Sequence, residues 1–223
     1  MNNKQYLSCL EFNPSDDPQA CVIFLHGLGA SADDFKALPA ALQLPDDKPV
    51  KFIFPNAPTR AVTVNNHIKM PAWFDVPDTS LTNLDWDGIH ASIREIHNIV
   101  QLQIDLGLPS EHIVIGGFSQ GGSIALAAAI QFDEPLAGAI GLSTFLPPVA
   151  DIQLASENNE LPVLLQHGSF DPVLPVDLGY MTRDYLESLQ LPVEWQEYPV
   201  EHQVSQRQVE AISQWLQALP CFF

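Results

Sequence analysis

The sequence predicts an α/β fold with a mainly parallel central sheet and helices on both of its faces. Two observations support this prediction. Short apolar runs rich in β-branched residues alternate with longer segments of helical periodicity, which is typical of successive βαβ units. The 223 residues are enough for one sizeable core, and neither an internal repeat nor a low-complexity segment divides them. We therefore expect a single domain over residues 1–223.

The predicted strands share a short length, an apolar composition and boundaries at Gly, Pro or polar residues. In chain order they cover residues 21–25, 50–54, 112–116, 136–142, 162–166 and 193–198. The first of them, Cys-Val-Ile-Phe-Leu, is apolar at every position, which is typical of a strand buried on both faces. We expect it to be a buried strand.

The predicted helices share apolar residues three or four positions apart. In chain order they cover residues 32–42, 85–104, 120–132, 176–189 and 204–219. Ser31 is available as the N-cap of the first helix. Either Asp85 or Asp87 caps the second helix, which Gly107 and Pro109 end.

Residues 59–85 form a long segment rich in Pro, Asn and Asp that is predicted to be irregular. Loops of this length are uncommon in compact domains and often carry function. Apolar residues in its first part, 59–76, leave three uses open: a homodimer contact, a lid, or a contact with a lipid tail.

The formal net charge of −18 argues against nucleic acid and anionic membrane surfaces as partners, because both are negatively charged. No apolar run approaches the about 18 residues of a membrane span, and the first residues lack the apolar core of a secretory signal. Cys9, Cys21 and Cys221 are widely spaced, which indicates neither a disulfide framework nor a zinc site. A cytoplasmic protein without stable membrane insertion is the expectation.

Gly117-Phe118-Ser119-Gln120-Gly121 matches the G-x-S-x-G pattern of a nucleophile elbow. A predicted strand precedes this segment and a predicted helix follows it, as such a turn requires. The two glycines leave room where strand meets helix. Ser119 is therefore the candidate nucleophile, exposed at the end of the sheet as in α/β-hydrolases.

A serine hydroxyl needs a base to take its proton, and in α/β-hydrolases the order along the chain is Ser, Asp or Glu, His. Asp171 and His202 each follow a late predicted strand by a short turn, where loops of a parallel sheet converge. Taken alone, Asp171 could be a turn residue and His202 an exposed loop residue. His167 is expected to be structural, and His97 to be solvated. The chain order favours Asp171 and His202 as acid and base.

Acyl transfer also needs backbone N–H donors for the developing oxyanion. Gln120, directly after the candidate nucleophile, is one candidate. Leu28 is the other, because the glycines around it allow the loop after the first predicted strand to turn its N–H groups inward. A plain glycine-rich turn into a helix remains the alternative for the Leu28 loop.

Five motifs occur in a fixed order along the chain. They are His26-Gly27-Leu28-Gly29, Met70-Pro71-Ala72-Trp73-Phe74-Asp75, Gly116-Gly117-Phe118-Ser119-Gln120-Gly121-Gly122, Asp171-Pro172-Val173-Leu174-Pro175 and Tyr198-Pro199-Val200-Glu201-His202. From about residue 21 to 219, the chain resembles the phospholipase/carboxylesterase family, which includes acyl-protein thioesterases and small bacterial carboxylesterases.

The resemblance implies a compact α/β-hydrolase fold without a large cap domain. It implies Ser119, Asp171 and His202 as a catalytic triad, Leu28 and Gln120 as oxyanion donors, and no metal or cofactor. The implied substrates are small-molecule esters or thioesters of short- to medium-chain acyl groups. Lysophospholipids and acylated protein cysteines are alternative substrates of the same site.

The family's acyl pocket is apolar, and motif position indicates which residues of this chain line it. They are Trp73, Val76, Leu146, Val173 and Leu174. Ordinary core packing is the alternative for these residues, above all for Trp73.

Two positions depart from the family pattern. Ser169 stands where the family commonly has an acidic residue, which leaves Asp171 without a rival carboxylate. Phe145 stands where the family has Trp or Tyr, which removes a polar ring atom from the pocket wall. The acyl-chain preference of relatives is therefore not transferred to this chain.

Three rival functions remain. A dienelactone-type hydrolase would prefer a cysteine where this chain has Ser119. A peptidase or lipase would carry an inserted cap or lid. A catalytically silent binding protein on a hydrolase scaffold would commonly lack a triad member, and here all three residue types are present.

Overall fold

The computed structural model describes residues 7–45, 47–78, 81, 83–147 and 154–220. Its centre is a seven-stranded sheet with the strand order β1-β3-β2-β6-β7-β8-β9. The strands are β1 (Cys9–Phe12), β2 (Ala20–Leu25), β3 (Val50–Pro55), β6 (Ile113–Phe118), β7 (Gly138–Leu142), β8 (Val163–Gly168) and β9 (Val193–Tyr198). All neighbours pair in parallel except β1, which pairs antiparallel with β3. The mainly parallel sheet confirms the predicted fold class.

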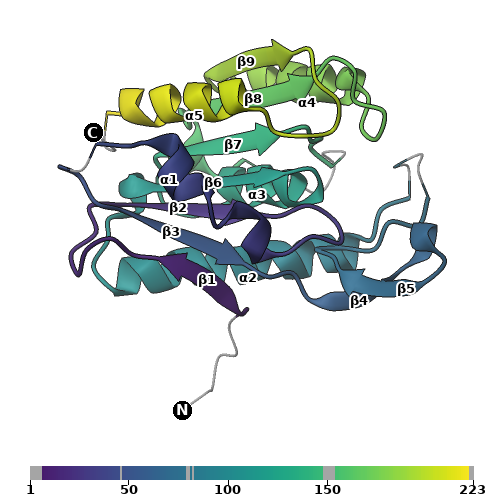
Figure 1. The fold of residues 1–223 in the computed structure, drawn as a ribbon, viewed down its shortest axis with the longest axis horizontal. Helices are drawn as coiled ribbons and strands as arrows, with labels where there is room; N and C mark the ends of the chain where they lie inside the picture. Colours follow the sequence, from purple (N-terminus) through teal and green to yellow (C-terminus); the bar gives the residue numbers. More distant parts are fainter. Residues whose placement is uncertain (1–6, 46, 79–80, 82, 148–153, 221–223) are drawn as a thin grey trace.

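Helices cover both faces of this sheet (Figure 1). They are α1 (Leu38–Leu42), α2 (Trp86–Asp105), α3 (Gln120–Ile130), α4 (Val176–Ser188) and α5 (Gln206–Ala218). Buried residues of α2, α3 and α4 share one apolar core, and those of α1 and α5 share the other. Alternate residues of β2 divide between the two: Ile23 joins the first core, whereas Val22 and Phe24 join the second. All six residues of β2 are buried, which confirms the predicted buried strand.

The long segment predicted to be irregular contains a β-hairpin, so that prediction is wrong for its first part. β4 (Thr59–Val62) and β5 (Ile68–Pro71) pair antiparallel as a separate two-stranded sheet. Asn66 and His67 have left-handed φ values of 56° and 58°, which allow the chain to reverse. The hairpin lies at the end of the molecule towards which the arrowheads of β7, β8 and β9 point (Figure 1).

Two other predictions differ from the structure. The helix predicted at 32–42 is broken into a 3₁₀ turn and α1, because Pro39 is tolerated only in the first turn of a helix. β1 was not predicted, since three of its four residues are exposed and its sequence lacks apolar alternation. Of the two candidate caps of α2, Asp85 is the N-cap and accepts a hydrogen bond from Gly88 N at 2.9 Å.

Short 3₁₀ turns connect several of these elements. They cover Ala32–Phe35, Thr63–Asn65, Ser110–His112 and Ser156–Asn158. The first follows the loop after β2, and the second lies within the hairpin. Both therefore lie beside the end of the sheet at which Ser119 is placed.

Candidate active site

Ser119 occupies a strained turn between β6 and α3. Its backbone has φ 54° and ψ −126°, a conformation that non-glycine residues rarely adopt. A Cβ atom at Gly117 would lie 2.5 Å from the carbonyl carbon of Gly121, and one at Gly121 would collide with the carbonyl oxygen of His26. The glycines flanking the serine are therefore required by the close approach of strand, helix and neighbouring loop.

The structure brings Ser119, His202 and Asp171 into one hydrogen-bonded chain. His202 Nδ1 lies 2.6 Å from Asp171 Oδ2, and His202 Nε2 lies 2.9 Å from Ser119 Oγ. A carboxylate only accepts hydrogen bonds, so the ring proton is on Nδ1 and Nε2 accepts the serine proton. This arrangement allows His202 to act as a general base toward Ser119.

The Asp171 carboxylate is buried and held from its other side. Its Oδ1 accepts hydrogen bonds from the backbone N–H groups of Val173 and Leu174, each at 2.9 Å. These bonds arise within one tight loop between β8 and α4. They leave Oδ2 directed at His202 and orient the carboxylate as the acid of a triad requires.

His167 lies beside this site without touching Ser119. Its Nε2–H donates to the carbonyl oxygen of Leu174 at 2.8 Å, and the same nitrogen is 3.7 Å from Asp171 Oδ2. Burial lowers the pKa of His167 below its ordinary value of 6.5 and favours the neutral ring. A buried, neutral ring whose Nε2–H is already hydrogen-bonded agrees with the structural role expected for His167.

His97 differs from its expected solvated state. Its ring is half-buried between α2 and α3, and its Nε2–H donates to the carbonyl oxygen of Ala128 at 2.8 Å. Burial lowers the pKa of His97. The residue that His97 contacts is 31 positions away along the chain, so helical periodicity alone does not predict the contact.

The two candidate oxyanion donors line the same cavity as Ser119 and His202. Among the residues that the structure describes, neither Leu28 nor Gln120 uses its backbone N–H in a hydrogen bond. The loop is held in place at the residue that follows the free Leu28 N–H. Gly29 has φ +74° and its N–H donates to the carbonyl oxygen of Pro71 at 2.8 Å, which links the loop to the hairpin.

This cavity has a volume of about 690 Å³ and is mostly apolar. Such a volume lies within the range of roughly 300–1,000 Å³ that is typical of small-molecule sites. Three of the expected acyl-pocket residues line it: Val76, Val173 and Leu174. Apolar side chains from several other elements complete the wall: Phe35, Val64, Phe74, Leu81, Phe118, Phe145, Leu178 and Val204.

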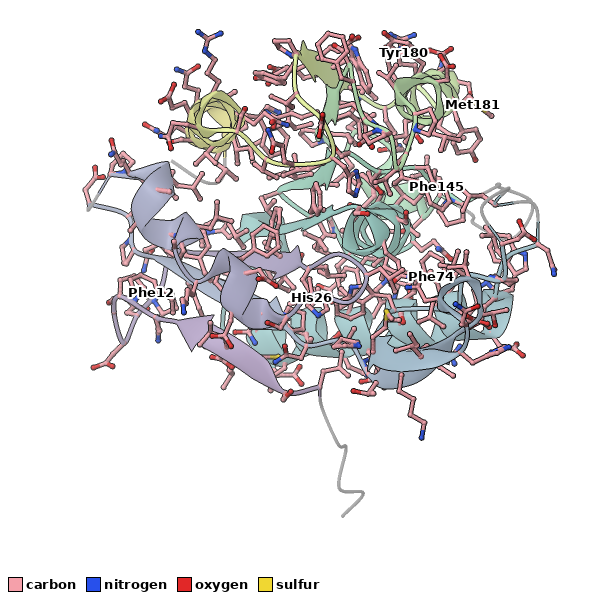
Figure 2. The ribbon with its side chains drawn as sticks, turned by 45° about the vertical axis from the view of Figure 1, so that its right-hand side comes forward. Phe12, His26, Phe74, Phe145, Tyr180 and Met181 are labelled. Atoms are coloured by element: carbon pink, nitrogen blue, oxygen red, sulfur yellow. The ribbon has the colours of Figure 1, made fainter. Side chains whose placement is uncertain are left out.

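The structure corrects the expectation for Trp73 and Leu146, which do not line the cavity. Both side chains are packed in the core, and the residue beside each one lines the wall instead: Phe74 and Phe145. Figure 2 labels these two phenylalanines. Both pairs lie in loops just beyond the ends of β5 and β7, so motif position alone does not decide which residue of a pair faces the cavity.

The described residues contain no group of three or more His, Cys, Asp or Glu side chains placed to hold a metal ion. Within the same part of the chain, no helix is both long and apolar enough to cross a membrane. Cys21 is fully buried, and burial raises the pKa of its thiol to about 12. It is therefore a small core residue, as its apolar strand predicts.

Comparison with known proteins identifies one family and several similar proteins. The family described as Phospholipase/Carboxylesterase matches residues 11–219. Acyl-protein thioesterase 1 of Schizosaccharomyces pombe is 40% identical over 83% of this chain and 84% of its own length. The corresponding protein of Gibberella zeae is 36% identical, over 85% and 86%.

Solved structures show the same fold. Arabidopsis thaliana SOBER1 superposes with a TM-score of 0.84 at 27% identity, covering 89% of this chain and 97% of that one. Zea mays acyl-protein thioesterase 2 has a TM-score of 0.82 at 27% identity, covering 96% and 99%. The similarity therefore extends over nearly the whole of each chain.

Proposed function

The chain belongs to the phospholipase/carboxylesterase family of hydrolases, and we propose that it cleaves acyl thioesters and carboxylic esters through Ser119, His202 and Asp171. The observation that carries this proposal is the continuous hydrogen-bonded chain from Asp171 Oδ2 through the His202 ring to Ser119 Oγ. The relatives named acyl-protein thioesterase favour an S-acyl group on a protein as one substrate.

In the proposed cycle, Ser119 Oγ attacks the acyl carbonyl carbon while His202 Nε2 takes the serine proton. The carbonyl oxygen becomes an oxyanion that accepts hydrogen bonds from the N–H groups of Leu28 and Gln120. When the tetrahedral intermediate collapses, the bond to the leaving group breaks and His202 gives its proton to the departing thiol or alcohol. Asp171 stabilises the imidazolium throughout.

Water then completes the reaction. His202 removes a proton from water, the hydroxide oxygen attacks the acyl-enzyme carbonyl, and the second intermediate releases the carboxylic acid. The proton returns from His202 to Ser119 Oγ. The cycle consumes one water for each ester or thioester bond and requires no metal or cofactor.

The apolar cavity supports an acyl chain as the part of the substrate that is recognised. The wall residues Val76 and Val173 come from segments far apart in the sequence, and both present aliphatic carbon to the space beside Ser119. Burying an acyl chain there would stabilise the enzyme–substrate complex by about 0.8 kcal/mol for each methylene removed from water. This stabilisation involves only the acyl chain and not the leaving group. It therefore does not distinguish esters from thioesters, and both can use the site.

The test is a panel of p-nitrophenyl esters of increasing chain length, assayed beside a palmitoyl-thioester peptide and a lysophospholipid. We expect Ser119→Ala to lower kcat by about 10⁶-fold, the scale of a lost serine in a triad. Ser213→Ala is the matched control, because Ser213 is buried in α5 and its hydroxyl donates to the carbonyl oxygen of Leu42.

Labelling with a fluorophosphonate tests the nucleophile directly. Ser119 Oγ attacks phosphorus and displaces fluoride, so the wild-type chain and Ser213→Ala should be labelled and Ser119→Ala should not. A Ser119→Ala protein that retains more than a tenth of the esterase activity contradicts the assignment. Absence of both turnover and labelling in the wild-type chain would instead support a silent scaffold.

A further inference from the structure

We propose that Trp73 is a positioning residue for the loop that carries Leu28, and that its side chain does not contact the acyl chain. The inference rests on the proposed function, because it concerns the N–H group that would hold the oxyanion. It assigns a role to a residue whose motif position suggested the pocket wall.

The indole of Trp73 is fully buried and directed at the loop after β2. Its Nε1–H donates to the carbonyl oxygen of His26 at 2.8 Å, and its ring centroid lies 5.3 Å from that of the His26 imidazole. The hydrogen bond joins residues 47 positions apart. It fixes the peptide group between His26 and Gly27, one peptide before the group that contains the Leu28 N–H.

The His26 side chain fixes the next peptide group. His26 Nε2 lies 3.0 Å from the backbone nitrogen of Ala57, whose N–H can only donate. Nδ1 therefore carries the ring proton and donates it to the carbonyl oxygen of Gly27 at 2.8 Å. In a planar trans peptide, the Gly27 carbonyl and the Leu28 N–H point in opposite directions. Fixing the carbonyl therefore aims the Leu28 N–H away from the His26 ring.

Trp73 is also attached to the second candidate donor. Gln120 Oε1 accepts a hydrogen bond from Trp73 N at 2.9 Å, and Gln120 Nε2 donates to the carbonyl oxygen of Phe74 at 2.8 Å. The backbone N–H of the same Gln120 is the other proposed oxyanion donor. Trp73 thus connects the two residues whose N–H groups must converge on one oxygen atom.

The geometry separates the roles of Trp73 and its neighbour. Phe74 lines the cavity, whereas Trp73 does not. A Trp73 side chain acting on the acyl chain would change the preferred chain length when altered. A side chain acting on the Leu28 loop would instead weaken stabilisation of the oxyanion equally for every chain length.

The experiment compares Trp73→Phe with Trp215→Phe. The first keeps an aromatic ring but removes the Nε1 donor. The second is the matched control, because Trp215 is a buried tryptophan of α5 in the core on the opposite face of the sheet. For each variant, kcat and KM are measured for p-nitrophenyl esters of three chain lengths. The inhibition constant of an alkyl trifluoromethyl ketone is measured alongside.

The ketone reports the oxyanion site because Ser119 Oγ adds to its carbonyl carbon, the serine proton passes to His202, and the carbonyl oxygen becomes an oxyanion. For Trp73→Phe we expect kcat to fall about 10- to 100-fold at every chain length, since misplacement of a catalytic group by about 1 Å has an effect of this order. KM should change by less than about threefold, and the inhibition constant should rise by the same factor as kcat falls. Trp215→Phe should change none of these quantities by more than about threefold.

A shift of chain-length preference with an unchanged inhibition constant would overturn the inference, and so would equal behaviour of the two variants. If Trp73→Phe does not fold, replacement of Trp73 by 3-benzothienylalanine during translation gives the decision, because sulfur in place of the N–H keeps the size of the bicyclic ring and removes only the Nε1 donor to the carbonyl oxygen of His26. The same selective loss then supports the inference, and an unchanged inhibition constant overturns it. A wild-type chain that hydrolyses no ester and binds no ketone overturns the proposed function itself.

Discussion

Asp171 Oδ2 lies 2.6 Å from His202 Nδ1, although the two residues are 31 positions apart in the sequence. They belong to the loops that follow β8 and β9, which are neighbouring parallel strands. A backbone hydrogen bond of 2.8 Å from Ser169 N to the carbonyl oxygen of Tyr198 ties the loop after β8 to the end of β9, and Phe170 N donates to the carbonyl oxygen of Val200 in the next loop at 3.1 Å. The contact is thus supported by sheet register and does not depend on two side chains alone.

Asp171→Asn tests the orientation of the His202 ring. The Asn Oδ1 can still accept from Val173 and Leu174, so the loop should keep its shape. The amide Nδ2 would donate to His202 Nδ1 and force the ring proton onto Nε2, where it can no longer accept from Ser119. We expect kcat to fall by about 10⁴-fold, as in other serine triads. Esterase kinetics measure it, and an unchanged circular dichroism spectrum is the control; a loss below tenfold contradicts the role of Asp171.

The sequence predicts those parts of the site that are encoded by a few neighbouring residues. The turn around Ser119 is local, because glycines two residues before and after it leave room for the close contacts seen there. The order Ser, Asp, His adds a second signal, and the structure brings Ser119, Asp171 and His202 within hydrogen-bond distance. Strand β9 has the predicted bounds, 193–198.

Features that depend on distant contacts were missed. The Asp75 carboxylate holds the β4–β5 hairpin, because it accepts hydrogen bonds from Thr63 N and Thr63 Oγ1 at 2.7 and 2.6 Å. The residue pattern within the hairpin does not predict that contact. The hydrogen bond from Trp73 Nε1 to His26 O likewise joins two motifs that the sequence presents separately. A tryptophan beside a phenylalanine gives no sign of which ring faces the cavity.

Ser169→Asp tests the position at which this chain departs from its family. Ser169 Oγ donates to Glu197 Oε1 at 2.6 Å, and Tyr180 OH donates to Glu197 Oε2. These two hydrogen bonds lower the pKa of Glu197, so its carboxylate is charged at neutral pH. A second carboxylate at residue 169 would repel it, and we expect a loss of roughly 0.5–1 kcal/mol in the free energy of unfolding, the scale of exposed charge pairs.

Urea unfolding at pH 7.5 measures this loss, with Ser169→Ala as the control that removes only the hydroxyl. Combining Ser169→Asp with Glu197→Gln should recover most of the difference between Asp and Ala at residue 169, because the repulsion needs both charges. If the double variant is as unstable as the sum of the single ones, charge repulsion is not the cause.

His97→Gln tests the contribution of a half-buried histidine to stability at low pH. The folded-state pKa of His97 is lowered by burial below the ordinary value of 6.5, so the unfolded chain takes up the proton first as pH falls. The stabilising difference is fully present above about pH 6.5 and is lost as the pH falls from there through the lower folded-state pKa. A glutamine keeps an N–H for the carbonyl oxygen of Ala128 but does not titrate.

We therefore expect the free energy of unfolding to decline less between pH 7.5 and 5 in His97→Gln than in the wild-type chain. One proton sets a ceiling of about 1.4 kcal/mol per pH unit on this difference in slope. Burial also lowers the pKa of His26 and His167, so part of the wild-type decline should remain. His67→Gln, at an exposed position of the hairpin turn, is the control; equal slopes in all three proteins would exclude the effect.

Leu28→Pro and Leu28→Ala separate a backbone role from a side-chain role at the second oxyanion donor. Alanine keeps the N–H and removes only a half-buried side chain, whereas proline removes the N–H itself. Loss of one oxyanion donor typically lowers kcat by about 10²–10³-fold. We expect a loss of that size for proline and less than about tenfold for alanine, with KM little changed in both.

The measurement is steady-state hydrolysis of one ester by proteins with matched thermal unfolding profiles. Proline also restricts the conformation of Gly27, so a partly unfolded variant would confuse the comparison. Replacement of Leu28 by its α-hydroxy acid during translation removes the N–H without adding a ring and should reproduce the loss in kcat. Equal kcat values for the alanine protein and the hydroxy-acid protein would show that the Leu28 N–H does not bind the oxyanion.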